Sequence, residues 1–149
     1  MNLTCGGAGG VHLKDEIGRL RDEVAAILNA SLDAVVSMDE CGRVTAWNAT
    51  AERIFGWTES EALGGDLADL VIPEADRARH REGVRRHLET GEARAIGRRV
   101  EMRAIRKGGE EFPVELTLAV RGDGAARRYT GFIRDITDLK RSERELAET

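Results

Sequence analysis

The sequence has few cysteines, few aromatic residues and no long apolar run. Its 149 residues include two cysteines, Cys5 and Cys41, and aromatic residues make up 4% of the chain. One cysteine lies in a predicted tail and the other in a predicted turn, which indicates neither a disulfide framework nor a thiolate metal site. No segment approaches the roughly 20 apolar residues of a membrane helix, and the first ten residues lack the apolar stretch of a signal peptide. We therefore expect a soluble chain in a reducing, cytoplasmic setting.

Charged residues are abundant, but their signs are balanced. Lysine and arginine number 23, aspartate and glutamate number 27, and the formal net charge is -4. Interspersed charges are typical of a solvated surface and do not indicate a nucleic-acid or membrane partner. The sequence shows no P-loop, no Ser-His-Asp series and no paired catalytic carboxylates, so we expect no enzyme activity within it. A chain of this length is expected to fold as one domain.

Two amphipathic segments flank a central region. Residues 1–10 contain four glycines and are predicted to be a disordered tail. Residues 11–29 are predicted to be an amphipathic helix, because apolar residues recur at spacings of three and four: Leu13, Ile17, Leu20, Val24 and Ile27. This seam packs either on its own domain or on a partner helix, and its narrow stripe with charged flanks favours dimerisation. A second helix is expected over 138–149.

The central region, residues 30–137, alternates short strands with short helices. Strands are predicted over residues 34–38, 43–47, 94–106, 110–121 and 126–136. Local signals predict the helix ends: Asn48 as a cap of a helix through Phe55, Thr58 with Glu61 as a capping box, Gly64 as a stop, Pro73 at the first position of a third helix, and Gly91 at its end. Two strands, several helices and three strands predict an α+β fold.

Several short motifs occur in this region in a characteristic order. They are Asp39 to Asn48, Glu52 to Trp57, Glu61 to Gly64, Ile72-Pro73, Thr90 to Glu92, Arg106 to Gly109, Phe112 to Leu116, and Gly131 to Thr137. In this order and spacing they resemble the PAS family over residues 30–137. The resemblance implies a five-stranded antiparallel sheet with short helices that form a pocket on one face. It also implies homodimers that signal to an effector such as a histidine kinase of a two-component system.

The position of His80 is loosely similar to that of the haem-binding histidine in oxygen-sensor PAS domains. It lies on the predicted helix before Gly91, with Arg86 six residues later. The resemblance implies that His80 binds haem iron, which would be the one metal site of the chain. Val100 stands where those sensors place an arginine that hydrogen-bonds bound oxygen, so the apolar Val100 predicts weaker discrimination in favour of oxygen if haem is bound. Haem, a non-covalent flavin and the absence of any cofactor all stay open, with flavin less favoured than haem.

The segment Asp135-Ile136-Thr137 is predicted to join the last strand to the C-terminal helix. Asp135 or Thr137 can cap that helix and fix its angle to the strand. The preferred hypothesis is a sensor module that binds a small ligand and passes a signal through this junction to an effector. A ligand-free dimerisation module is the alternative. An enzyme is expected only if this chain is a fragment of a larger kinase or cyclase. The ligand, the effector and the dimer orientation stay open.

Overall fold

The computed structural model describes residues 11–91, 96–122 and 126–148. The predicted tail over residues 1–10 lies outside the described residues, as do Cys5, the first two residues of the predicted strand 94–106, and Asp123 and Gly124 of a predicted turn.

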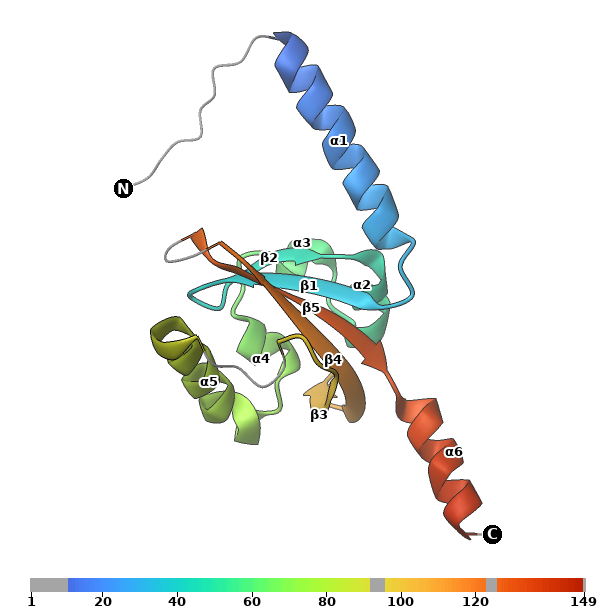
Figure 1. Ribbon diagram of the computed structural model, residues 1–149. Coiled ribbons are helices and arrows are strands. Elements are labelled where there is room, and N and C mark those ends of the chain that lie inside the picture. Colours follow the sequence, from blue (N-terminus) through green and yellow to red (C-terminus); the bar gives the residue numbers. More distant parts are fainter. Residues whose placement is uncertain (1–10, 92–95, 123–125, 149) are drawn as a thin grey trace.

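A five-stranded antiparallel sheet forms the centre of the molecule (Figure 1). In space the strands follow the order β2-β1-β5-β4-β3. The elements in chain order are α1 (Val11–Asn29), β1 (Ala34–Asp39), β2 (Val44–Trp47), α2 (Ala49–Phe55), α3 (Glu59–Ala62), α4 (Leu67–Val71), the 3-10 helix η1 (Glu74–Asp76), α5 (Arg77–Thr90), β3 (Val100–Ile105), β4 (Glu111–Arg121), β5 (Arg128–Asp135) and α6 (Thr137–Glu148). The predicted α+β fold with five antiparallel strands is confirmed.

Local capping signals set the starts and ends of the short helices as predicted. Asn48 Oδ1 accepts a hydrogen bond from Ala51 N at 2.9 Å and caps α2. At α3, Thr58 and Glu61 form the capping box. Gly91 ends α5 with a φ of 80°, a left-handed conformation that glycine adopts without strain.

Two predictions about element boundaries were wrong, and one helix was missed. Pro73 does not open the third helix, because its backbone is extended and α5 begins only at Arg77, after η1. Helix α4 was not predicted, although Asp66 caps it by accepting a hydrogen bond from Ala68 N at 3.0 Å. The strand predicted from residue 94 begins at Val100, since Gly97 has a φ of 75° and breaks the extended run before it.

The hydrophobic core lies between the short helices and one face of the sheet, which we call the inner face. Phe55 from α2 is fully buried between Trp47 and Phe112, with ring centroids 5.6 and 5.9 Å away. The Trp47 and Phe55 side chains therefore pack in the core. Burial of such large rings is a major stabilising contribution to a domain of this size.

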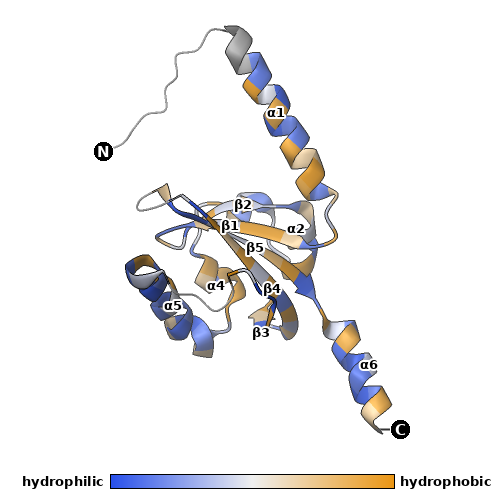
Figure 2. Ribbon diagram, viewed as in Figure 1, coloured by the Kyte–Doolittle hydropathy of each residue, from blue (hydrophilic) through white to orange (hydrophobic). Residues whose placement is uncertain are grey.

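The two terminal helices project away from the sheet in different directions (Figure 1). Both helices join the sheet at the same end, because Ala34 at the start of β1 pairs with Ile133 near the end of β5. Both helices carry apolar and polar bands along their length (Figure 2). Among the described residues, no helix has the length and apolar character needed to cross a membrane.

Candidate functional site

A row of apolar side chains on the inner face of β3 and β4 is only partly covered. We call it the β3–β4 patch, and it consists of Val100, Met102, Leu116 and Leu118. Alternation along each strand places these side chains on the same face as the buried Ala104 and Phe112. Met102 is 43% exposed and the other three are half-buried. The inner face is thus well packed around Phe112 and only partly covered at the four residues of the β3–β4 patch.

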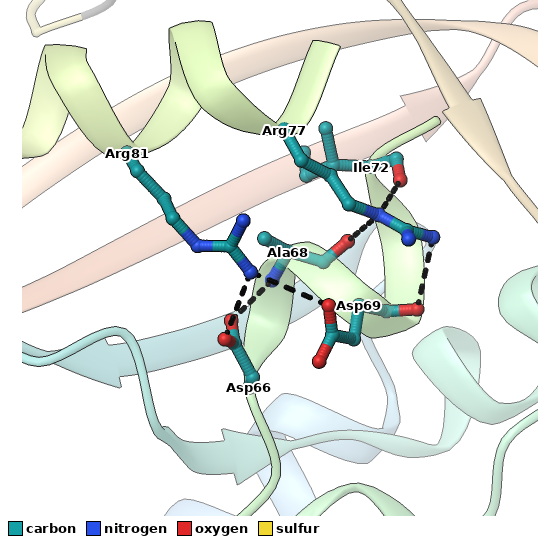
Figure 3. A network of polar contacts seen from close by, with 6 residues as sticks. All are labelled: Asp66, Ala68, Asp69, Ile72, Arg77 and Arg81. Atoms are coloured by element: carbon teal, nitrogen blue, oxygen red, sulfur yellow. Dashed lines mark hydrogen bonds and ion pairs between the residues drawn. The ribbon is translucent and has the colours of Figure 1, made fainter. Parts of the chain in front are cut away.

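Helix α5 is fastened to α4 by two arginine side chains in its first half (Figure 3). Arg77 Nε donates to the carbonyl oxygens of Ala68 at 3.0 Å and Ile72 at 2.9 Å. Arg81 forms ion pairs with Asp66 at 3.1 Å and with Asp69 at 3.3 Å. The Ala68 carbonyl oxygen already accepts from Ile72 N, whereas the Ile72 contact satisfies a carbonyl oxygen just past the end of α4 that otherwise needs water. These contacts hold this end of α5 in place.

The second half of α5 is fastened to the sheet by a buried histidine. His87 Nδ1 lies 2.7 Å from the hydroxyl oxygen of Tyr129 on β5, and His87 is 6% exposed. Arg127 NH1 lies 3.4 Å from the same nitrogen and donates to the His87 carbonyl oxygen at 3.4 Å. Burial, followed by the positive charge of Arg127, lowers the pKa of His87. The neutral ring is therefore the form that this contact favours. No local pattern in the sequence predicted this contact.

His80 faces a surface hollow of about 250 Å³ between α5 and the β1–β2 turn. The lining is strongly charged and includes Glu40, Asp66, Arg81 and Arg85. Burial lowers the pKa of the half-buried His80, and Arg81 acts in the same direction, while the Asp66 carboxylate opposes them. The neutral imidazole, which is the form that binds metals, is thus favoured.

The three residues predicted to hold haem do not line a common hollow. Arg86 is exposed and Val100 belongs to the β3–β4 patch, and neither contributes to the hollow at His80. That hollow is also smaller than the roughly 300–1,000 Å³ of typical small-molecule sites. The arrangement described here does not fit a haem group held by these three residues.

The predicted junction between β5 and α6 is a compact polar unit. Asp135 Oδ1 accepts hydrogen bonds from Thr137 N at 2.9 Å and from Thr137 Oγ1 at 2.5 Å. Ile136 is 3% exposed, and its N–H donates to the Pro113 carbonyl oxygen of β4 at 3.1 Å. The carboxylate of Asp135, rather than the hydroxyl of Thr137, therefore fixes the start of α6.

Arg106 connects this junction to the rest of the domain, a role that the sequence did not reveal. Its NH2 group donates to Asp135 Oδ2 at 3.1 Å, and its NH1 group donates to the Ile54 carbonyl oxygen at 2.7 Å. The guanidinium also lies 3.7 Å above the centre of the Phe112 ring. Burial alone would raise the pKa of Asp135, but the hydrogen bonds from Thr137 and Arg106 outweigh it and hold this pKa below its usual value.

Comparison with known proteins accounts for this combination of sheet, helices and junction. The family model of the PAS fold matches residues 22–136. The chain belongs to the PAS fold family. The crystal structure of a PAS domain from Colwellia psychrerythraea is similar to it, with a TM-score of 0.64 and 24% sequence identity over 80% of this chain and 98% of that one. This likeness supports the fold alone.

Three curated relatives of this PAS domain are much longer proteins. An uncharacterised protein of Azorhizobium caulinodans is 41% identical over 81% of this chain and 16% of its own length. The sensor protein FixL of Bradyrhizobium diazoefficiens is 32% identical over 83% of this chain and 24% of its own length. The cell-division control histidine kinase PdhS of Brucella ovis is 32% identical over 84% of this chain and 12% of its own length. The chain thus spans a quarter or less of each relative.

Proposed function

We propose that this PAS domain is a homodimeric, cytoplasmic regulatory module. It binds a small ligand or cofactor at the β3–β4 patch and passes the resulting change through the Asp135-Ile136-Thr137 junction into α6. One observation carries the proposal. The partly covered β3–β4 patch includes residues of β4, and β4 also binds the junction through the Pro113 carbonyl oxygen. Because the patch is apolar, the ligand is expected to have an apolar body with few polar atoms.

The path from the patch to α6 is short. Leu116 on the patch pairs with Ile133 of β5, and two residues along β4 Val114 pairs with Asp135. Between the paired strands and the helix, the Pro113 carbonyl oxygen holds Ile136 N. A ligand that shifts β4 therefore acts on the residues that fix the start of α6. Such a ligand regulates the effector only if it binds two arrangements of α6 with different affinity.

The relatives support a signalling role for the module. One is named a sensor protein and another a histidine kinase. Both extend far beyond the region shared with this chain. We infer that α6 leads toward an effector of the histidine-kinase type, and that the domain itself carries no catalysis.

Native mass spectrometry of the purified protein tests the ligand. A molecule is expected to remain bound to the wild type and to be lost from Leu118→Trp, which fills the patch. Thr117→Trp is the matched control, since the neighbouring side chain points to the opposite face of β4. This control is expected to retain the molecule. If the wild type carries no molecule and is stabilised by none that are added, the ligand-free dimerisation module becomes the better hypothesis.

A haem sensor is the second candidate, favoured by the neutral imidazole of His80. Because the surrounding residues do not fit the group as arranged, no step of the proposed relay passes through it. An absorption spectrum from roughly 300 to 600 nm after supply of haem decides the matter. A Soret band that His80→Ala removes and Arg86→Ala retains supports the candidate, and a colourless protein excludes it.

A further inference from the structure

Helix α1 presents an apolar seam that its own domain leaves exposed. Ile17, Leu20, Val24 and Ile27 are 44%, 57%, 53% and 69% exposed. Hydrogen bonds join α1 to the core at its C-terminal end, where Asn48 Nδ2 donates to the Leu28 carbonyl oxygen at 2.7 Å and Ala49 N donates to Asn29 Oδ1 at 2.9 Å. This α1 seam therefore runs along a helix that is fixed at one end and projects from the core (Figure 1).

The spacing of the α1 seam assigns the charged positions beside it. With Ile17 and Val24 at heptad position a and Leu20 and Ile27 at d, Glu16 occupies g and Arg21 occupies the following e position. Both side chains are exposed. Among the residues whose side chains the structure describes, neither makes a hydrogen bond or an ion pair. They are free to pair with another helix.

We propose that α1 pairs with α1 of a second copy of this chain, in parallel and in register. In a parallel dimer, position g of one helix faces the following position e of the other. Glu16 then faces Arg21 of the partner subunit, and the two-fold symmetry forms this pair twice. The proposal rests on the dimeric module proposed above and adds its orientation and its register.

In an antiparallel pair of α1 helices, side chains of like charge would face each other. In an antiparallel pair, e positions face e positions and g positions face g positions. The central layers of the α1 seam would then place Arg21 beside Arg21 of the partner subunit and Glu23 beside Glu23 of the partner subunit. The charges beside the seam thus favour the parallel arrangement, because they attract in one orientation and repel in the other.

A parallel pair also directs both α6 helices toward the same side. Helix α1 spans about 28 Å at 1.5 Å per residue. Its core-attached end is its C-terminal end, so a parallel pair brings both cores to one end of the coil. Because α6 leaves the sheet on the side away from α1 (Figure 1), both α6 helices then point away from the coil. An antiparallel pair would separate the two cores along the coil.

Charge exchange tests the pairing in the full chain. Glu16→Lys and Arg21→Glu are each expected to weaken self-association about tenfold, because each turns two attractive pairs into repulsive ones. Mixed in equal amounts, the two variants are expected to form heterodimers in which both pairs attract. Sedimentation velocity measures the self-association and native mass spectrometry counts the heterodimers. Unchanged self-association of either variant, or no preference for heterodimers on mixing, overturns the pairing.

Cross-linking tests the orientation. In a background with Cys5→Ser and Cys41→Ser, oxidised Ile27→Cys is expected to form a disulfide-linked dimer, since the two d positions meet in a parallel pair. In an antiparallel pair Ile27 faces Ile17 instead, so cross-links that form only when Ile17→Cys and Ile27→Cys are mixed overturn the proposal. Leu20→Glu with Val24→Glu is expected to give a monomer, and a dimer that survives both changes shows that the α1 seam is not the interface.

These outcomes are separable from those of the ligand experiment. The β3–β4 patch lies within one core, so a monomeric Leu20→Glu, Val24→Glu variant is expected to retain the bound molecule seen in the wild type. A failed α1 pairing with a retained ligand leaves the sensor role in place. A confirmed pairing without any ligand supports the dimerisation module.

Discussion

Replacing Asp135 by asparagine removes the charge that joins Arg106 to the start of α6. The amide oxygen can still accept the two hydrogen bonds from Thr137, so the helix start is retained. What is lost is the charge-assisted bond to Arg106 at 3.1 Å. Asp135→Asn therefore isolates the link between the domain and its C-terminal helix.

The size of the effect follows from the burial of the pair. Both side chains are 26% exposed. Hydrogen bonds to charged groups contribute about 1.5–3 kcal/mol, and exposed ion pairs contribute up to about 1 kcal/mol. Arg106 keeps its bond to the Ile54 carbonyl oxygen, so it is not left unpaired. We expect Asp135→Asn to lower the free energy of unfolding by about 2 kcal/mol, which corresponds to roughly 7 °C in the melting temperature.

The loss of stability caused by Asp135→Asn is expected to become smaller at low pH. The pKa of Asp135 is held below its usual value, so its carboxylate stabilises the folded state above the unfolded pKa of about 4. That contribution is lost as the pH falls through the folded pKa. The difference in stability between wild type and Asp135→Asn is therefore expected to be full at pH 7 and to shrink below about pH 4.

Urea denaturation followed by tryptophan fluorescence measures these differences, because Trp47 is 3% exposed in the core. Glu110→Gln is the matched control. Glu110 pairs with the same arginine at 3.1 Å, but its side chain is 68% exposed, so a loss below about 0.5 kcal/mol is expected. The reasoning is refuted if Asp135→Asn costs no more than this control, or if its cost persists unchanged at pH 3.

Two further substitutions test the contacts of Asn48 with α1 and α2 and the contact of α5 with the sheet. Asn48→Ala removes the cap of α2 and the bond to the Leu28 carbonyl oxygen, and is expected to cost about 3 kcal/mol in thermal melts. Asn48→Ser keeps a capping oxygen without placing a charge beside the Leu28 and Asp33 carbonyl oxygens, and should cost clearly less; equal losses would contradict the capping role. Tyr129→Phe removes the bond to His87 and is expected to speed amide exchange in the second half of α5 about tenfold. Because the pKa of His87 is lowered, the wild-type contact should also weaken as the pH falls below about 6.5. If neither Tyr129→Phe nor the lower pH changes the protection of the α5 amides, this contact does not hold the helix.

Interactions between near neighbours in the chain were predictable from the sequence. Asn48 precedes a run of helix-forming residues and caps it, and Thr58 with Glu61 forms a capping box three residues apart. These signals act within one turn of backbone, so the residue types alone specify them. The alternation along β4 likewise predicted which side chains are buried, and Phe112 and Val114 are buried on that face.

Contacts between distant segments were not predictable in the same way. His87 and Tyr129 are 42 residues apart, and Arg106 and Asp135 are 29 residues apart. Each contact depends on strand register and on the placement of a helix, which no local pattern specifies. For the same reason, the resemblance identified His80, Arg86 and Val100 as a group, although the backbone places Val100 on a strand apart from the hollow at His80.

The pairing of the first strand with the last also bears on how the chain folds. Ala34 of β1 pairs with Ile133 of β5, so one central contact of the sheet closes a loop of about 100 residues. Contacts of such high sequence separation slow folding. During synthesis, β1 has no neighbour on its β5 side until residues 128–133 have been made, so the central sheet is completed only when nearly the whole domain is available. Truncation before β5 is therefore expected to leave an exposed strand edge that is prone to aggregation.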